Sequence, residues 1–298
     1  MSQKDTLEEN ENYYTSANEI TFKLKVIRFY FKYLGSLFPN FSVYLFTKLF
    51  STLKKRKIKE KHLHFLNTAE TKKVSIEEHE LQFYFWGNGN KKILIVHGWE
   101  GMSADFSELI NALVKNGFSV IAFDLPAHGN SSGNLTHLPM VISILKRIIP
   151  EYSPFYGVIG HSLGAAASAF SMAELNGNIS LSKLVLMGLH PVPFEFFKQF
   201  QHVLSINDKL FAKCVSYVEE KLGRKVNGMS VHEVNSSISA DKVLLVHDEK
   251  DQVANLKIIE KLNVEWENSE LFTGEHGGHY KHYKHPEVVE KVVEFMKT

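Results

Sequence analysis

The chain has 298 residues, of which 44% are hydrophobic and 22% charged, and its formal net charge is +1. This length accommodates one large α/β domain, or a domain with an insertion, with a sizeable core. The single cysteine, Cys214, excludes an internal disulfide and favours a reducing compartment. Residues 1–12 are acidic and polar, unlike a secretory signal, and no stretch approaches the ~20 apolar residues of a membrane-spanning helix. We therefore expect a cytoplasmic protein.

Positive charge is concentrated near the N-terminus. Residues 21–61 carry eleven Lys or Arg and one acid, whereas residues 1–20 carry one Lys and five acids. Apolar spacing predicts one helix over residues 20–38, a second over 41–50, and then a basic cluster at 54–57. We expect residues 1–61 to form a basic helical extension that packs on the rest of the protein. The alternative is peripheral docking on the anionic inner face of the membrane. No recognised motif supports nucleic-acid binding.

From about residue 74, short strands alternate with helices. Strands are expected over residues 80–86, 92–96, 119–123, 154–159, 184–187, 243–246 and 264–272, and helices over 104–115, 138–148, 165–175, 256–262 and 286–296. This alternation predicts an α/β domain over residues 62–298, built on a mostly parallel sheet flanked by helices. Helix-like, aromatic-rich sequence interrupts the pattern over about 189–240.

Residues 160–164 (GHSLG) join the strand at 154–159 to a helix rich in small residues. In this setting, Gly-x-Ser-x-Gly is typical of a nucleophile elbow, where the serine occupies a strained turn and its neighbours two residues away must be small. The turn exposes the serine hydroxyl and directs the helix N-terminus toward the reacting group. Ser162 is therefore the candidate nucleophile.

Residues 97–101 (HGWEG) directly follow the strand at 92–96. The backbone N–H groups of Trp99 and Leu163 are the candidate donors to an oxyanion, and His97 is expected to be structural. This loop and residues 124–133 (DLPAHGNSSG) resemble the oxyanion loop and the D-x-P-x-H-G-x-S turn of the α/β-hydrolase superfamily. The resemblance covers about residues 74–298. It implies the α/β-hydrolase fold, with a helical cap inserted after the sixth strand.

The resemblance also implies a catalytic carboxylate after a late strand. Asp248 and Asp251 both lie in the loop after the strand at 243–246. In the family, the second Asp of such a loop usually belongs to the triad, so Asp251 is expected to be the acid and Asp248 to cap the loop. Asp124 is the remaining alternative, although its position better suits hydrogen bonding within its own turn.

The base is expected at His279, in the GGHY segment between the last strand and the last helix, where the family carries a Gly-His pair. The resulting chain order of Ser, Asp and His is that of these hydrolases. His276 is the main alternative, and the three-residue spacing of His276, His282 and His285 also raises the question of a metal site. We expect no metal, because the glycines at 277–278 interrupt a helix and no acidic or Cys partner is evident.

Together these residues predict a serine hydrolase that cleaves carboxylic esters through an acyl-enzyme and uses no cofactor. The aromatic residues within 194–200 suit either a lid over an apolar acyl pocket or the underside of an inserted helix. Two alternatives are a membrane-docked lipid hydrolase with the same triad and a catalytically silent binding protein of the same fold. The natural ester, its acyl chain length and the oligomeric state stay open.

Overall fold

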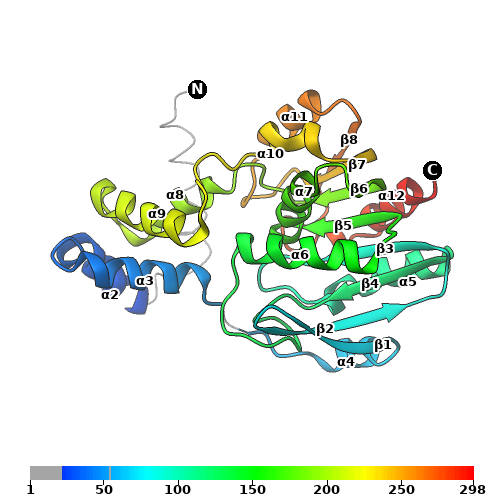
Figure 1. The fold of residues 1–298 in the computed structure, drawn as a ribbon, viewed down its shortest axis with the longest axis horizontal. Helices are drawn as coiled ribbons and strands as arrows, with labels where there is room; N and C mark the ends of the chain where they lie inside the picture. Colours follow the sequence, from blue (N-terminus) through cyan, green and yellow to red (C-terminus); the bar gives the residue numbers. More distant parts are fainter. Residues whose placement is uncertain (1–21, 54) are drawn as a thin grey trace. The chain divides into compact units, whose positions relative to one another are not determined.

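The computed structural model describes residues 22–53 and 55–298, which divide into two compact units (Figure 1). Of the described residues, the larger unit contains those within Leu53–Pro191 and Val231–Thr298, and the smaller one contains residues 22–52 together with Val192–Ser230. The sequence predicted an extension over 1–61, separate from a domain over 62–298. The structure instead groups the N-terminal helices with the inserted helices, and the unit boundary falls after Thr52.

The larger unit is built on an eight-stranded sheet in the order β1-β2-β4-β3-β5-β6-β7-β8. β2 runs antiparallel to both β1 and β4, and every other neighbouring pair is parallel. The strands are β1 (Glu70–Ile76), β2 (His79–Trp86), β3 (Lys91–Val96), β4 (Phe118–Phe123), β5 (Gly157–His161), β6 (Leu181–Met187), β7 (Ala240–Asp248) and β8 (Ser269–Gly274). The prediction of a mostly parallel sheet flanked by helices is confirmed.

Helices cover both faces of this sheet (Figure 1). Ile93 and Ile95 of β3 pack into a core with residues of α5 and α12, and the alternation of side chains along a strand turns Leu94 and Val96 to the opposite face, beside α6 and α7. The helices of this unit are α4 (Glu60–Leu66), η2 (Ser103–Phe106), α5 (Ser107–Lys115), α6 (Leu138–Tyr152), α7 (Leu163–Leu175), α10 (Val231–Val234), η3 (Asn235–Ser237), α11 (Leu256–Glu265), η4 (His282–Lys284) and α12 (Pro286–Lys297). Among the described residues, no helix combines the length and the apolar character that crossing a membrane requires.

Three sequence expectations differ from these elements. β1 was not predicted, because its charged residues leave it exposed along most of its length at the edge of the sheet. β2 was expected to be an exposed strand, yet most of its residues are buried, because Tyr84 and Trp86 pack in the core on one face and Phe83 packs against Phe123 and Tyr152 on the other. The last predicted strand, 264–272, divides between the end of α11 and β8.

The smaller unit is helical. It contains α2 (Phe22–Phe29), the π-helical turn η1 (Tyr30–Leu34), α3 (Pro39–Ser51), α8 (Phe194–Leu204) and α9 (Asp208–Leu222) (Figure 1). Its core joins Phe31 and Phe46 from the N-terminal helices to Leu204, Leu210 and other residues of the inserted helices. The predicted N-terminal helical pair and the insertion after β6 are therefore halves of one hydrophobic core.

The aromatic residues of α8 belong to this core. Phe197 lies 4.3 Å from Phe50 and 6.0 Å from Phe46 between ring centroids, and Phe200 packs edge-on against both. These contacts match the second expectation for this segment, in which its aromatic residues form the hydrophobic underside of an inserted helix. Cys214 is fully buried here, and burial raises the pKa of its thiol to about 12.

Candidate active site

The sheet topology brings the candidate residues together at the carboxyl ends of the parallel strands. β3, β5, β7 and β8 are linked by parallel pairing, either directly or through β6, so the loops that follow them leave the sheet at the same end. These loops contain Trp99, Ser162, Asp251 and His279. In open α/β sheets, ligands bind outside the carboxyl ends of the strands.

Ser162 occupies the strained turn that the pentapeptide predicts. It has φ +51° and ψ −115°, between β5 and the first turn of α7. A Cβ added at Gly160 would lie 2.6 Å from the Cα of Ala165, and one at Gly164 would collide with the carbonyls of β3 and the loop after it. The two glycines are therefore required by the close approach of backbone on both sides of the turn.

Ser162, His279 and Asp251 form a continuous hydrogen-bonded chain. His279 Nε2 lies 2.8 Å from Ser162 Oγ, and His279 Nδ1 lies 2.7 Å from Asp251 Oδ2. The carboxylate can only accept, so Nδ1 carries the proton and Nε2 presents its lone pair to the serine hydroxyl. The structure thus brings together all three side chains expected from the sequence, with the imidazole in the tautomer that a general base needs.

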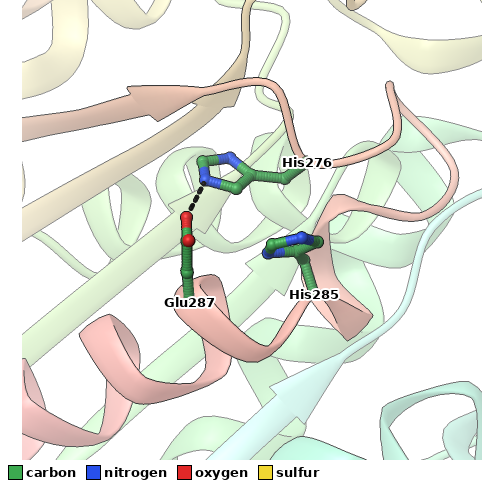
Figure 2. A group of neighbouring side chains, drawn as sticks. All are labelled: His276, His285 and Glu287. Atoms are coloured by element: carbon green, nitrogen blue, oxygen red, sulfur yellow. Dashed lines mark hydrogen bonds and ion pairs between the residues drawn. The ribbon is translucent and has the colours of Figure 1, made fainter.

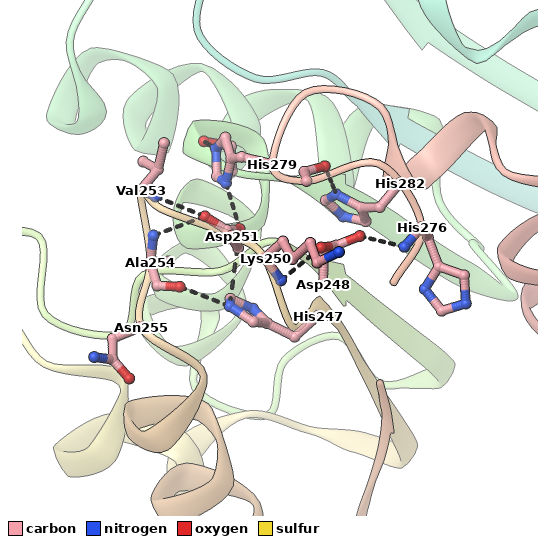
Figure 3. Close-up of polar contacts among 12 residues, drawn as sticks. His247, Asp248, Lys250, Asp251, Val253, Ala254, Asn255, His276, His279 and His282 are labelled. Carbon is pink, nitrogen blue, oxygen red and sulfur yellow. Dashed lines mark hydrogen bonds and ion pairs between the residues drawn. The ribbon is translucent and has the colours of Figure 1, made fainter. Parts of the chain in front are cut away.

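Asp251 is held by its own loop as well as by His279 (Figure 3). Its Oδ1 accepts hydrogen bonds from the backbone N–H groups of Val253 and Ala254, at 2.8 and 2.9 Å, and the side chain is fully buried. Burial alone would raise the pKa of Asp251, but the hydrogen bond and charge of His279 outweigh it and the net pKa is lowered. The carboxylate is therefore fixed in position and ionised.

Asp248 has the capping role that the sequence suggested (Figure 3). Its Oδ1 accepts the N–H of Lys250 at 2.8 Å, and its Oδ2 accepts the N–H of His276. Its carboxylate therefore ties the loop after β7 to the loop after β8. Asp124 accepts the N–H of Asn130 within its own turn at 2.8 Å and the N–H of Ser103, at the start of η2, at 2.9 Å. Neither carboxylate is hydrogen-bonded to His279.

The two expected oxyanion donors lie beside the nucleophile. Leu163 is the first residue of α7, where a helix leaves its N–H groups without an intrahelical partner. The backbone of the Trp99 loop approaches closely, since a Cβ on Gly98 would lie 3.0 Å from the Cβ of Ser162. Within the part of the chain that the structure describes, no hydrogen bond is found from either the Trp99 or the Leu163 N–H. Both donors are therefore available to a developing oxyanion.

His97 has the structural role expected of it. Its Nε2 accepts the N–H of Leu125 at 3.0 Å, and its Nδ1 donates to the carbonyl of Gly98 at 2.8 Å. His128 reinforces the same loop by accepting the N–H of Glu100 at 3.0 Å. Burial lowers the pKa of His97 to about 4 and that of His128 to about 3, so both imidazoles are neutral at pH 7.

An ion pair that the sequence analysis missed, between exposed Arg56 and buried Asp105, braces the loop after β3. Arg56 bonds both oxygens of Asp105, at 2.8 and 3.2 Å, and also donates to the carbonyl of Glu100 at 2.9 Å. Lys284, just after the loop of His279, is 3.2 Å from the same carboxylate. Burial would raise the pKa of Asp105, but the hydrogen bond from Arg56 and the nearby positive charges lower it overall. Arg56 therefore anchors this loop, a role that its place in the basic cluster at 54–57 did not reveal.

Neutral histidines pack behind the base. His161, next to the nucleophile, places Nε2 2.9 Å from the backbone carbonyl of His279, and His282 places Nδ1 3.1 Å from that of Gly278. Burial keeps the pKa of His161 well below its usual value and lowers that of His282 to about 4. Both rings are neutral hydrogen-bond donors that hold the loop carrying His279, and they add no positive charge beside it.

The competing histidine, His276, belongs to a different group of side chains (Figure 2). Its Nε2 lies 3.2 Å from Glu287, and His276, His285 and Glu287 each offer a ligand atom within 4.8 Å of the other two. Two imidazoles and a carboxylate are donors that zinc accepts. The expectation that no acidic partner is nearby was wrong, because α12 begins at Pro286 and carries Glu287 back toward the loop. His282 lies outside this group.

Comparisons with known proteins agree with the fold and the motifs. A family model described as "alpha/beta hydrolase fold" matches residues 91–224. Among solved structures, the esterase Pf2001 of Pyrococcus furiosus superposes with a TM-score of 0.60 at 19% identity, over 83% of this chain and 96% of that one. Est1E from Butyrivibrio proteoclasticus superposes with a TM-score of 0.59 at 15% identity, over 76% and 97% of the two chains. These matches agree on the α/β-hydrolase fold for this chain.

Two curated relatives match over shorter segments. A Drosophila melanogaster protein named "Probable serine hydrolase" is 33% identical over 93 residues, which cover 28% of this chain and 27% of the relative. A 2-hydroxy-6-oxononadienedioate/2-hydroxy-6-oxononatrienedioate hydrolase of Escherichia coli O81 is 33% identical over 138 residues, which cover 42% of this chain and 43% of the relative. The chain thus matches less than half the length of either protein.

Proposed function

We propose that the protein is a serine hydrolase that cleaves carboxylic esters through an acyl-enzyme. The observation that carries this proposal is the chain of contacts through His279, 2.8 Å from Ser162 Oγ on one side and 2.7 Å from Asp251 Oδ2 on the other. An imidazole oriented by a buried carboxylate and bonded to a hydroxyl in a strained turn is the arrangement that activates a serine. The esterases with the same fold make esters the first substrates to test.

In the acylation step, Ser162 Oγ attacks the ester carbonyl while its proton moves to His279 Nε2. The carbonyl oxygen gains negative charge and is stabilised by the N–H groups of Trp99 and Leu163. The bond from the carbonyl carbon to the alcohol oxygen then breaks, and the alcohol leaves with the proton from His279. Asp251 stabilises the imidazolium throughout and stays ionised.

In the deacylation step, His279 takes a proton from water, and the resulting hydroxide attacks the acyl carbon. The bond to Ser162 Oγ breaks, the serine regains its proton from His279, and the carboxylic acid is released. The cycle uses only these side chains, two backbone donors and water.

A fluorophosphonate probe tests the proposal, because such probes phosphonylate an activated serine. The wild-type protein is expected to be labelled and Ser162→Ala to lose the label. The matched control is Ser171→Ala on the same helix, whose hydroxyl is 3.3 Å from the carbonyl of Ile142 and is not bonded to the triad. Absence of labelling in the folded wild-type protein would instead support a catalytically silent binding protein of the same fold.

A further inference from the structure

Hydrophobic side chains are unusually exposed on the N-terminal helices of the smaller unit. Among the residues that the structure describes, fourteen large hydrophobic side chains are exposed, and nine of them lie between residues 22 and 44. Scattered exposed apolar residues are normal on a protein surface, but a cluster of this kind marks an interaction site. The cluster therefore indicates a surface that binds a partner.

The helix formed by α2 and η1 has two apolar stripes. Leu24, Ile27 and Phe31 face inward and pack in the core shared with the inserted helices. Phe22, Val26, Phe29 and Tyr33, three or four residues apart, form a second stripe whose exposed fractions lie between 50% and 83%. A surface helix of a globular protein needs only the first stripe to fold, so the second is free to bind something else.

The exposed surface continues onto α3. The Phe29 and Tyr33 rings contact each other in a tilted arrangement with centroids 4.9 Å apart, and the Phe41 ring contacts both Tyr30 and Tyr44, at 5.7 and 6.3 Å between centroids. Phe41 and Tyr44 are each more than half exposed. We refer to this surface, from Phe22 to Tyr44, as the aromatic face.

The charged residues within the segment that forms the aromatic face are all positive. Residues 22–53 contain five basic residues and no acid. Lys25 and Lys32 are exposed beside the outer stripe, and the ammonium of Lys32 lies 5.2 Å from the centre of the Tyr33 ring. Arg28 is the exception, because its guanidinium bonds Ser205 within the unit. Exposed lysines interleaved with Phe and Tyr are the composition of helices that lie in a lipid interface.

We propose that the aromatic face docks the protein on an anionic membrane surface, with the rings at the level of the acyl chains and the lysines at the headgroups. The positive charge of the aromatic face favours an anionic membrane over a second copy of the chain as the binding partner. A second copy of the chain would bring two faces of the same positive sign together, whereas an anionic leaflet complements them. Docking at this face would bring the hydrolase to esters held in the membrane, so that part of the inference rests on the proposed function.

Co-sedimentation of the full chain with vesicles tests the proposal. The protein is expected to sediment with vesicles of phosphatidylcholine and phosphatidylglycerol at low salt, much less at high salt, and not with phosphatidylcholine alone. Lys25→Glu/Lys32→Glu should weaken partitioning about 25-fold or more, since each lysine at an anionic surface contributes about fivefold. Phe22→Ser/Phe29→Ser should weaken it at least about tenfold, because both rings lose their contact with lipid.

The matched control is Lys209→Glu/Lys213→Glu, which reverses two exposed lysines on α9 in the same unit and should sediment like the wild-type protein. Ser162→Ala should also sediment normally, which separates failure of docking from failure of catalysis. The proposal is overturned if the full chain stays in the supernatant with anionic vesicles, as it would if its own acidic residues 1–20 covered the face. It is equally overturned if both aromatic-face variants bind like the wild-type protein, or if Phe22→Ser/Phe29→Ser converts a dimer to a monomer.

Discussion

Replacing Asp251 by Asn should change the tautomer of His279, moving the imidazole proton from Nδ1 to Nε2. The Val253 and Ala254 N–H groups require an oxygen at the Oδ1 position, so the new amide nitrogen takes the Oδ2 position facing His279 Nδ1. An amide N–H donates, so Nδ1 becomes the acceptor and the imidazole proton moves to Nε2. His279 then has no lone pair directed at Ser162, so it cannot accept the serine proton as a general base.

The expected cost of Asp251→Asn is about 10⁴ in kcat, by analogy with the same change in a serine-protease triad, which corresponds to about 5 kcal/mol of barrier. Asp248→Asn is the matched comparison, because it also removes a buried carboxylate from the same loop. It should cost about 1–3 kcal/mol of folding stability by leaving a backbone N–H poorly paired, and it should lower kcat far less.

Steady-state hydrolysis of short p-nitrophenyl esters, together with urea unfolding of each variant, separates the two effects. The reasoning is refuted if Asp248→Asn is the more damaging change in kcat while remaining folded. In that case the catalytic carboxylate has been misassigned.

Three further predictions concern the surroundings of the site. Arg56→Ala should lower the free energy of unfolding by about 1–3 kcal/mol and reduce kcat more than it raises KM, because Asp105 loses its main partner beside the oxyanion loop. Folding stability should fall as the pH drops from about 6.5 toward 4, because the unfolded chain takes up protons that the buried imidazoles of His97, His128, His161 and His282 refuse, each contributing about 1.4 kcal/mol per pH unit. Urea unfolding at pH 7 and pH 5 measures this slope, and His97→Gln should lower it by the contribution of one imidazole. Cys214 should resist a thiol reagent in the native protein and react once the chain is unfolded.

Each of these has a clear contrary result. For the Arg56–Asp105 ion pair, Lys73→Ala is the control, because both partners of the Lys73–Glu80 ion pair are exposed and its loss should cost under about 1 kcal/mol. If Arg56→Ala and Lys73→Ala lower the free energy of unfolding equally, Arg56 does not brace the loop. A slope that His97→Gln leaves unchanged would mean that His97 takes up its proton in the folded state as readily as in the unfolded chain. Rapid modification of Cys214 in native protein would mean that the core of the smaller unit opens readily.

Much of the candidate site was predictable from local sequence, because the loops that follow parallel strands all lie at the same end of the sheet. Gly160 and Gly164 mark the turn of Ser162 by excluding any Cβ, and this requirement is visible in the sequence itself. Asp251 follows β7, which has a strong apolar signal, and His279 follows the less apolar β8, so their meeting with Ser162 was predictable from chain order.

The missed features depend on long-range packing. Arg56 and Asp105 are 49 residues apart, and nothing in the local sequence of Arg56 distinguishes it from its basic neighbours. The pairing of the N-terminal helices with the insertion depends on Phe46 meeting Phe197, which local helical periodicity does not encode. Glu287 was missed as a neighbour of His276 because the direction in which α12 leaves the loop is set by tertiary structure.

The most direct test of the account is the rate of p-nitrophenyl ester hydrolysis by Ser162→Ala compared with the wild-type protein, both shown to be folded by their unfolding transitions. The account predicts measurable turnover by the wild-type protein and a fall of about 10⁴ to 10⁶ in kcat for the variant, because no other hydroxyl is bonded to His279 among the described residues. Full esterase activity in Ser162→Ala would contradict the claim that Ser162 is the nucleophile.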